Sequence, residues 1–229
     1  MKNPSHNTVP ILEARRIHMI YGGRRILHDI DFSVMPRERI ALVGGFDSGK
    51  SVLLRILAGL TAPTSGDVYL GGENVVSYDP WGVPWRRPIG YVAQNHGLRS
   101  NMTASENIAL PLMYLKHTDK SAALSVARTL LKRMGIDGGD SRPSELSPGE
   151  RGIVALCRAL ILEPSILLFD EPTVILDVDH ADLVMNVLGE LRNRIGLAVV
   201  GACTSESVAK IIGSRILWLK NGELEEDGD

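Results

Sequence analysis

The segment GGFDSGKS, residues 44–51, is the most informative part of this sequence. It follows the apolar run RIALV, residues 39–43, which is typical of a strand, and precedes VLLRILAGL, residues 52–60, which is typical of a helix. A glycine-rich turn between a strand and a helix directs backbone N–H groups and the positive end of the helix dipole at an anion. In the pattern G-x-x-x-x-G-K-[ST], Lys50 reaches the outer phosphates of a nucleotide and the Ser51 hydroxyl ligates magnesium. The segment therefore predicts a nucleoside triphosphate site.

A length of 229 residues fits one α/β domain, or one domain with an inserted lobe. The 25 lysine and arginine residues nearly balance the 27 aspartate and glutamate residues, so the charge gives no support for a nucleic-acid binder or a polybasic membrane patch. Cys157 and Cys203 lie in apolar segments, which favours reduced thiols in the cytosol over a disulfide framework. No apolar run approaches the roughly 20 residues that span a bilayer, so we expect any membrane to be crossed by another chain.

Short strands are expected on both sides of the glycine-rich segment. Residues 11–21 and 24–34 alternate apolar and polar side chains, as half-buried antiparallel strands do. Tyr21 ends the first of them, where its ring either stacks on a nucleotide base or only packs against the protein. Another apolar run, IGYVA at residues 89–93, ends on the polar side chain of Gln94. These patterns predict an antiparallel unit near the start of the chain and a further strand that leads to Gln94.

The residues after Gln94 are helical in character. Apolar side chains recur at helical spacing in residues 103–115 and again in residues 119–135. Pro111 is expected to break the first of these helices, because proline removes a backbone donor. We expect an inserted helical lobe over about residues 103–163.

A capping signature stands near the end of this lobe. Ser147, followed by Pro148 and by Glu150, predicts a capping box that opens a helix running to about Leu162. The residues are explained by a well-capped helix alone. A serine and a glycine, Gly149, at a helix N-terminus also form a second anion site.

The run SILLFDEPT, residues 165–173, is a continuous apolar strand that ends in two acids. A buried parallel strand that carries functional groups at its carboxyl end has this pattern. Asp170 is expected to hold magnesium, and Glu171 is placed to polarise an attacking water.

Taken in order, these motifs resemble those of the ATP-binding subunit of an ABC transporter, over essentially the whole chain. GGFDSGKS is similar to the Walker A motif, Gln94 to the Q-loop, LSPGE at residues 146–150 to the signature, ILLFDE at residues 166–171 to Walker B, and Leu176-Asp177 to the D-loop. The resemblance implies an α/β fold of the P-loop NTPase type, with a RecA-like core, an antiparallel β subdomain and the inserted helical lobe. It also implies that residues 1–229 form a single ATP-binding domain.

The resemblance further implies the composition of the site. ATP with Mg²⁺ is expected to bind between the Walker A motif of one chain and the signature of another, in a head-to-tail dimer. The expected metal ligands are Ser51, Gln94 and Asp170, and the expected catalytic residues are Glu171, Gln94 and Thr204. The residues expected to bind the nucleotide are Tyr21, Gly44, Gly45, Ser48, Gly49, Lys50, Ser51, Val52, Ser147, Gly149 and Asp177, with the ring of Tyr21 against adenine.

Within the family, RPSELSPGE at residues 142–150 and NMTASENIALPLMY at residues 101–114 are most similar to the Mla/MCE phospholipid-transport and lipoprotein-releasing ATPases. This similarity implies a peripheral subunit on the cytoplasmic face of the inner membrane, which couples Mg-ATP hydrolysis to transport of lipid or lipoprotein by a membrane permease. The expected partners are that permease and a second ATP-binding subunit, the same chain or a related one, with no nucleic acid. The permease is expected to dock near Gln94 and the apolar segment at residues 109–115.

Three positions depart from the family pattern. Asp47 replaces the usual internal glycine of Walker A, and its carboxylate opposes triphosphate binding unless the side chain turns outward. Pro148 replaces a signature glycine and removes one N–H donor. Thr204 occupies the position of the switch histidine, where it can donate a hydrogen bond but cannot carry a positive charge.

Three hypotheses follow from these motifs. The first is a working transporter ATPase, supported by the Walker motifs and Glu171. The second is a degenerate subunit with weak or no ATPase activity that acts as a structural or regulatory partner, supported by the three departures. The third, a soluble ABC-type ATPase of DNA repair or translation, is disfavoured because those proteins usually carry two such domains or a long coiled-coil insert.

Overall fold

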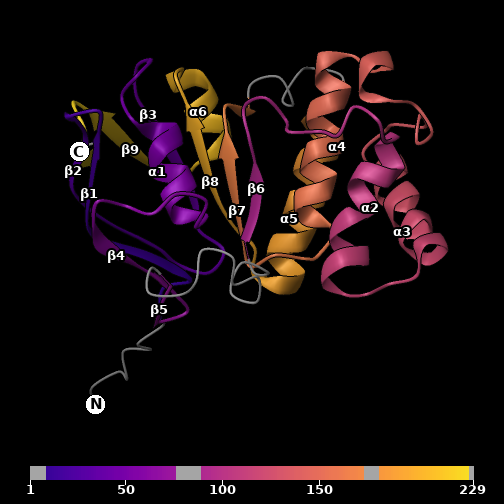
Figure 1. The fold of residues 1–229 in the computed structure, drawn as a ribbon, viewed down its shortest axis with the longest axis horizontal. Coiled ribbons are helices and arrows are strands. Elements are labelled where there is room, and N and C mark those ends of the chain that lie inside the picture. The colour runs from indigo at the N-terminus through magenta and orange to yellow at the C-terminus, as the bar shows by residue number, and fades with distance from the viewer. Residues whose placement is uncertain (1–8, 76–88, 173–180, 227–229) are drawn as a thin grey trace.

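The computed structural model describes residues 9–75, 89–172 and 181–226 (Figure 1). In this part of the chain the strands form two sheets. The first comprises β1 (Leu12–Tyr21), β2 (Arg24–Val34), β4 (Ser65–Leu70) and β5 (Glu73–Asn74), in the spatial order β2-β1-β4-β5. β1 pairs antiparallel with both β2 and β4, so the alternating pattern was interpreted correctly.

The second sheet is mostly parallel and lies at the centre of the molecule. It comprises β3 (Arg39–Val43), β6 (Ile89–Val92), β7 (Ile166–Asp170), β8 (Ala198–Cys203), β9 (Arg215–Lys220) and β10 (Glu223–Glu226), in the spatial order β10-β9-β3-β8-β7-β6. β10 alone runs antiparallel to its neighbour. Every residue of β7 and β8 is buried, because both faces of the sheet are covered.

Helices cover the two faces unequally. They are α1 (Lys50–Leu57), α2 (Ala104–Leu115), α3 (Lys120–Arg133), α4 (Pro148–Leu160), α5 (Ala181–Ile195) and α6 (Glu206–Ile212). Alternate residues of β3 enter different cores: Ile40 packs in the cluster that contains α1, and Ala41 packs in the cluster that contains α4, α5 and α6. α2, α3 and α4 gather beyond β6, at the opposite end of the molecule from β1 and β2 (Figure 1). None of the helices in the described ranges has the length and hydrophobicity that a membrane span needs.

The prediction that Pro111 breaks its helix was wrong, because α2 continues through this residue to Leu115. A proline inside a helix removes one backbone hydrogen bond and costs about 3 kcal/mol or more. The first turns of α2 offset this cost. Thr103 and Glu106 form a complete capping box, and the buried side chain of Asn107 donates to three backbone carbonyls and accepts from the backbone N–H of Arg99. The helix is therefore held in place before the chain reaches Pro111.

Candidate functional site

The loop between β3 and α1 has a backbone that only glycine permits at two positions. A Cβ atom on Gly44 would lie 2.5 Å from the Leu219 carbonyl oxygen, closer than real contacts allow. Gly49, the N-cap of α1, has φ of 101° and packs against Ile26 and Leu27 of β2. The glycines of the motif therefore let the loop pass between β9 and β2 and end at the start of α1.

Lys50 is the first residue of α1, and its ammonium group is buried against the loop. Its Nζ donates to the carbonyl oxygens of Gly44 at 2.7 Å and Gly45 at 2.9 Å. Among the described residues, no carboxylate forms an ion pair with Lys50. A buried positive charge without a counter-charge is costly, so the loop is suited to hold an anion.

Two further groups in the loop lack partners inside the described chain. The Ser48 hydroxyl is buried and has no hydrogen-bond partner there. The N-terminus of α1 has no side-chain cap and no acidic residue in its first turn, so its N–H groups face outward from the helix end. Phosphate oxygens would satisfy the hydroxyl, the N–H groups and the Lys50 charge together.

Ser51 and Asp170 meet at the edge of the loop. The Ser51 hydroxyl donates to Asp170 Oδ1 at 3.0 Å, and Asp170 itself is 2% exposed at the end of β7. The pKa of Asp170 is raised above its usual value, because the effect of burial exceeds that of the Ser51 hydrogen bond and of the charges of Arg55 and Lys50, which lower it. A hydroxyl and a carboxylate are oxygen ligands of the kind that Mg²⁺ prefers, with phosphate oxygens and water completing its shell. The pair therefore fits the predicted metal site.

Gln94 lies in the turn after β6, with an exposed side chain. In the described part of the chain no hydrogen bond joins it to Ser51 or Asp170. Its assignments as a metal ligand and a catalytic residue stay predictions.

Glu171 follows directly after the Asp170 strand and is half-buried. Its backbone N–H donates to the carbonyl oxygen of Ala202, 2.9 Å away, and its φ of 55° turns the chain out of the sheet. The pKa of the Glu171 carboxyl group is raised above its usual value, mainly by burial and further by the charge of Asp170. The charge of Lys50 and a hydrogen bond from the Thr204 backbone act in the opposite direction. A carboxylate with a raised pKa is suited to accept a proton.

Thr204 lies just after β8, with an exposed side chain. The structure brings its backbone to Glu171. A hydrogen bond from its hydroxyl to a phosphate stays a prediction.

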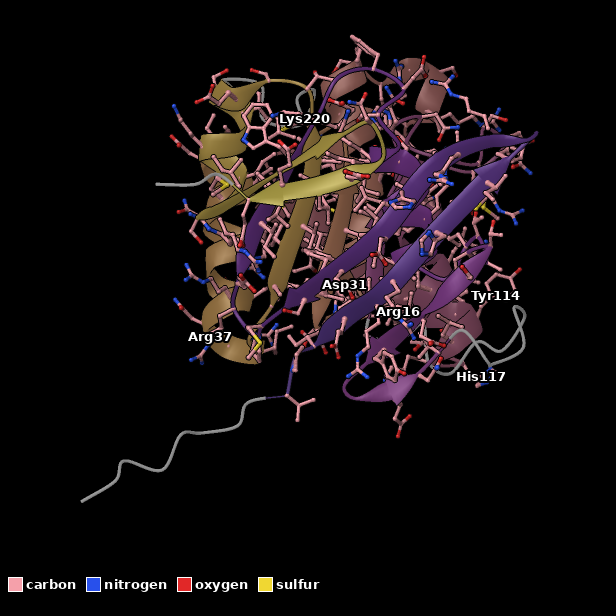
Figure 2. All side chains as sticks on the ribbon, turned by 90° about the vertical axis from the view of Figure 1, so that its left-hand side faces the viewer. Arg16, Asp31, Arg37, Tyr114, His117 and Lys220 are labelled. Atoms are coloured by element: carbon pink, nitrogen blue, oxygen red, sulfur yellow. The ribbon has the colours of Figure 1, made fainter. Side chains whose placement is uncertain are left out.

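The loop opens onto two adjoining cavities. One, of about 320 Å³, is lined by Arg24, Ile26, Asp47, Ser48, Gly49, Lys50, Ser51 and Val52. The other, of about 580 Å³, shares Arg24, Ile26, Asp47 and Ser48 with the first and extends to Arg25, Phe46 and Lys220. Lys220 ends β9, where the chain turns into β10 (Figure 2). Sequence reasoning did not identify Arg24 and Ile26; the only signal was their position just after Tyr21.

Tyr21 stands at the end of β1, paired in register with Arg24 of the cavity wall. Tyr21 is 74% exposed as a residue, so its ring is accessible to a planar partner. Its role in stacking on a base stays a prediction.

Asp47 has an exposed side chain and φ of 60°. Aspartate tolerates this left-handed conformation better than most residues, which explains how it stands where glycine is usual. Its side chain lines both cavities, so it retains a repulsive interaction with an anion.

We expect Asp47→Asn to bind ATP roughly fivefold more tightly than the wild type, since two like charges at 4 Å repel by about 1 kcal/mol in water. Asparagine keeps the size and the left-handed preference of aspartate, so calorimetry on this variant isolates the charge. Asp47→Glu, which keeps the charge, is the control and should show no gain. Equal affinities of Asp47→Asn and the wild type would contradict the assigned repulsion.

The signature segment forms the predicted cap. The Ser147 hydroxyl accepts from the Glu150 N–H at 3.2 Å, the Glu150 carboxylate accepts from the Ser147 N–H at 2.7 Å, and Pro148 occupies the first position of α4. Helices α4 and α1 pack in different core clusters, and α4 lies toward the opposite end of the molecule from α1 (Figure 1). In the described ranges no hydrogen bond joins Ser147 or Gly149 to the phosphate loop of their own chain. Their assignment to a nucleotide stays a prediction, and Asp177 lies outside the described residues.

A glycine-rich phosphate loop that leads into a helix, with a serine from the first turn of that helix and an aspartate from the end of β7, defines a P-loop nucleotide-binding domain. Residues 27–174 match the family model described as ABC transporter, and the chain belongs to this family. It is 38% identical over 222 residues to the "Lipoprotein-releasing system ATP-binding protein LolD" of Psychrobacter arcticus, covering 94% of this chain and 98% of that protein.

Solved structures give the same result for the fold. The chain is similar to the dimeric structure of MJ0796, a bacterial ABC transporter cassette, with a TM-score of 0.85 and 30% identity over 95% of this chain and 99% of that one. It is equally similar to the structure of the same cassette in a post-hydrolysis state bound to ADP and Pi. The predicted fold class and the predicted family are therefore confirmed, and the chain is an ATP-binding subunit of the ABC type.

Proposed function

We propose that this chain hydrolyses Mg-ATP to drive the movement of lipid or lipoprotein by a membrane permease. The observation that carries the proposal is the 38% identity over 222 residues to a protein named as part of a lipoprotein-releasing system. The similarity covers 98% of that protein. A similarity of that extent supports the working ATPase over the degenerate subunit. The intact pairing of Ser51 with Asp170 and the placement of Glu171 support it independently.

The described side chains have separate roles at the nucleotide. Lys50, Ser48 and the N–H groups of α1 bind the phosphates, and Tyr21 orients the base. Ser51, Asp170 and Gln94 would hold Mg²⁺, which neutralises phosphate charge when bound. Glu171 orients and polarises the attacking water, and Thr204 donates to the γ-phosphate.

A second ATP-binding subunit, the same chain or a related one, completes the site in this proposal. Ser147 and Gly149 at the start of α4, together with Asp177, act on the nucleotide of that second subunit. The dimeric MJ0796 structures support such an arrangement. The chain acts as a single domain over residues 1–229, with its helical lobe at about residues 103–163, on the cytoplasmic face of the inner membrane.

The permease docks beside the C-terminal half of α2. Ala109 is fully buried, and Leu112 and Met113 pack against the core, so these residues are lobe interior. Tyr114 is 70% exposed and lies near His117 at the surface (Figure 2). The docking surface is therefore narrower than the whole 109–115 segment, and Tyr114 is its accessible apolar side chain.

Reconstitution with the permease tests this function. We expect proteoliposomes that contain the complex, a labelled lipoprotein and a labelled phospholipid to release one of the two cargoes only when ATP is supplied. In the same vesicles Tyr114→Cys should crosslink to the permease, whereas Ile211→Cys, a 49% exposed position on α6, should not. ATP hydrolysis without movement of either cargo would contradict the proposal.

A further inference from the structure

We infer that Arg158 is a positioning residue that holds the Gln94 turn against helix α4. The inference rests on the proposed function, because Gln94 matters only if the chain turns over ATP. Arg158 stands near the end of α4, the helix that begins with the signature residues. Its guanidinium donates to the carbonyl oxygen of Gly97 at 2.8 Å and to that of His96 at 2.7 Å. Two donors of one side chain thus engage two consecutive peptide groups of the turn that begins at Gln94.

The turn needs such support because its own backbone is irregular. His96 and Gly97 have φ of 61° and 56°, and the first value is uncommon for a residue other than glycine. The internal bonds of the turn are short-range: His96 N–H donates to Ala93, and Gly97 N–H donates to Asn95. Contacts from two other elements fix the path of the turn: Arg158 of α4 binds the carbonyls of His96 and Gly97, and Asn107 of α2 binds the backbone of Arg99 just after them.

A second contact joins the same two elements just before the turn. A Cβ atom on Gly90 of β6 would lie 2.7 Å from the carbonyl oxygen of Ala159, the residue next to Arg158. β6 therefore approaches α4 as closely as backbone allows. The strand and the turn that carries Gln94 are fixed to the helix at two successive points.

Backbone groups, and not a carboxylate, are the partners that the described residues give Arg158. In the described ranges no carboxylate forms an ion pair with it, and the nearby Arg99 is also positive. Backbone carbonyls are the partners that offset its burial. An apolar side chain would fill the same space at a lower desolvation cost. We therefore attribute the guanidinium at this position to its two hydrogen bonds to the turn. Movement of the Gln94 turn and of the α4 start at Ser147 is then linked through one rigid helix.

The test uses the purified complex with its permease and the variants Arg158→Lys and Arg158→Gln. We expect ATP affinity to stay within twofold of the wild type, because the phosphate loop is untouched, while kcat falls roughly 10- to 100-fold. Lysine keeps the charge but not the fork, so it should not rescue kcat. Arg128→Gln, which breaks an exposed ion pair on α3, is the matched control and should leave both quantities unchanged.

Hydrogen exchange of the wild type and the variants gives a readout independent of turnover. Loss of amide protection confined to residues 94–99 is expected for both Arg158 variants. Unchanged kcat with unchanged exchange in Arg158→Gln would overturn the inference, and so would a parallel loss of ATP affinity, which indicates general damage. If the wild-type complex itself does not hydrolyse ATP, the proposed function fails, and the exchange experiment still decides whether Arg158 holds the turn.

Discussion

Lys50→Ala is expected to weaken ATP binding by about 2–3 kcal/mol, or roughly 30- to 150-fold, because it removes the buried ammonium from the phosphate loop. A hydrogen bond to a charged group is worth more than a neutral one, and here the charge has no carboxylate partner in the described chain to compete with the phosphates. Calorimetry with Mg-ATP measures the effect directly.

Two controls separate the loss of charge from damage to the loop. The Lys50 ammonium also donates to Gly44 and Gly45, so its removal leaves two carbonyls without this donor. Lys50→Arg keeps a positive donor and should retain more affinity than Lys50→Ala if charge is what binds ATP. Lys132→Ala, an exposed position on α3, should bind ATP as the wild type does. Equal affinity in Lys50→Ala and the wild type would rule out this loop as the nucleotide site.

Glu171→Gln is expected to lower ATP hydrolysis by about 10² to 10⁴ while leaving ATP binding intact. Glutamine fills the same space and can accept a hydrogen bond, but it cannot take a proton from water. Single-turnover hydrolysis and ATP affinity should be measured on the same sample, together with release from vesicles. If Glu171→Gln hydrolyses ATP at the wild-type rate, another group activates the water and the assignment fails.

The pH dependence of hydrolysis gives a second signature of Glu171. Burial is the largest influence on its pKa and raises it above the usual glutamate value. The carboxylate form is the active one, so hydrolysis should be fully present at higher pH and decline as the pH falls through this raised pKa. The acidic limb should start at a higher pH than an exposed glutamate would give. Its Glu171 component should be absent from the residual activity of Glu171→Gln, which leaves the contribution of Asp170, whose pKa is also raised by burial.

Local sequence determined the phosphate loop and the elements around it. Gly44, Gly49, Lys50 and Ser51 act through backbone freedom, charge and position relative to one helix end, all of which depend on neighbours in the chain. The capping box at Ser147 and the alternation of β1 and β2 are local in the same sense, and both were predicted correctly. Pro111 shows where a local rule fails, because the capping box and the Asn107 hydrogen bonds hold the first turns of α2 and offset the one missing hydrogen bond.

Tertiary structure alone decided which distant groups meet. Ser51 contacts Asp170, 119 residues later, because the start of α1 and the end of β7 meet at the carboxyl ends of the parallel strands. Arg24 and Ile26 join the cavity wall since β2 folds over the loop. Arg158 reaches the turn after Gln94, 61 and 62 residues before it, since Gly90 lets β6 approach α4. Such contacts depend on strand order and on burial across the whole core, and no pattern of neighbouring residues contains that information.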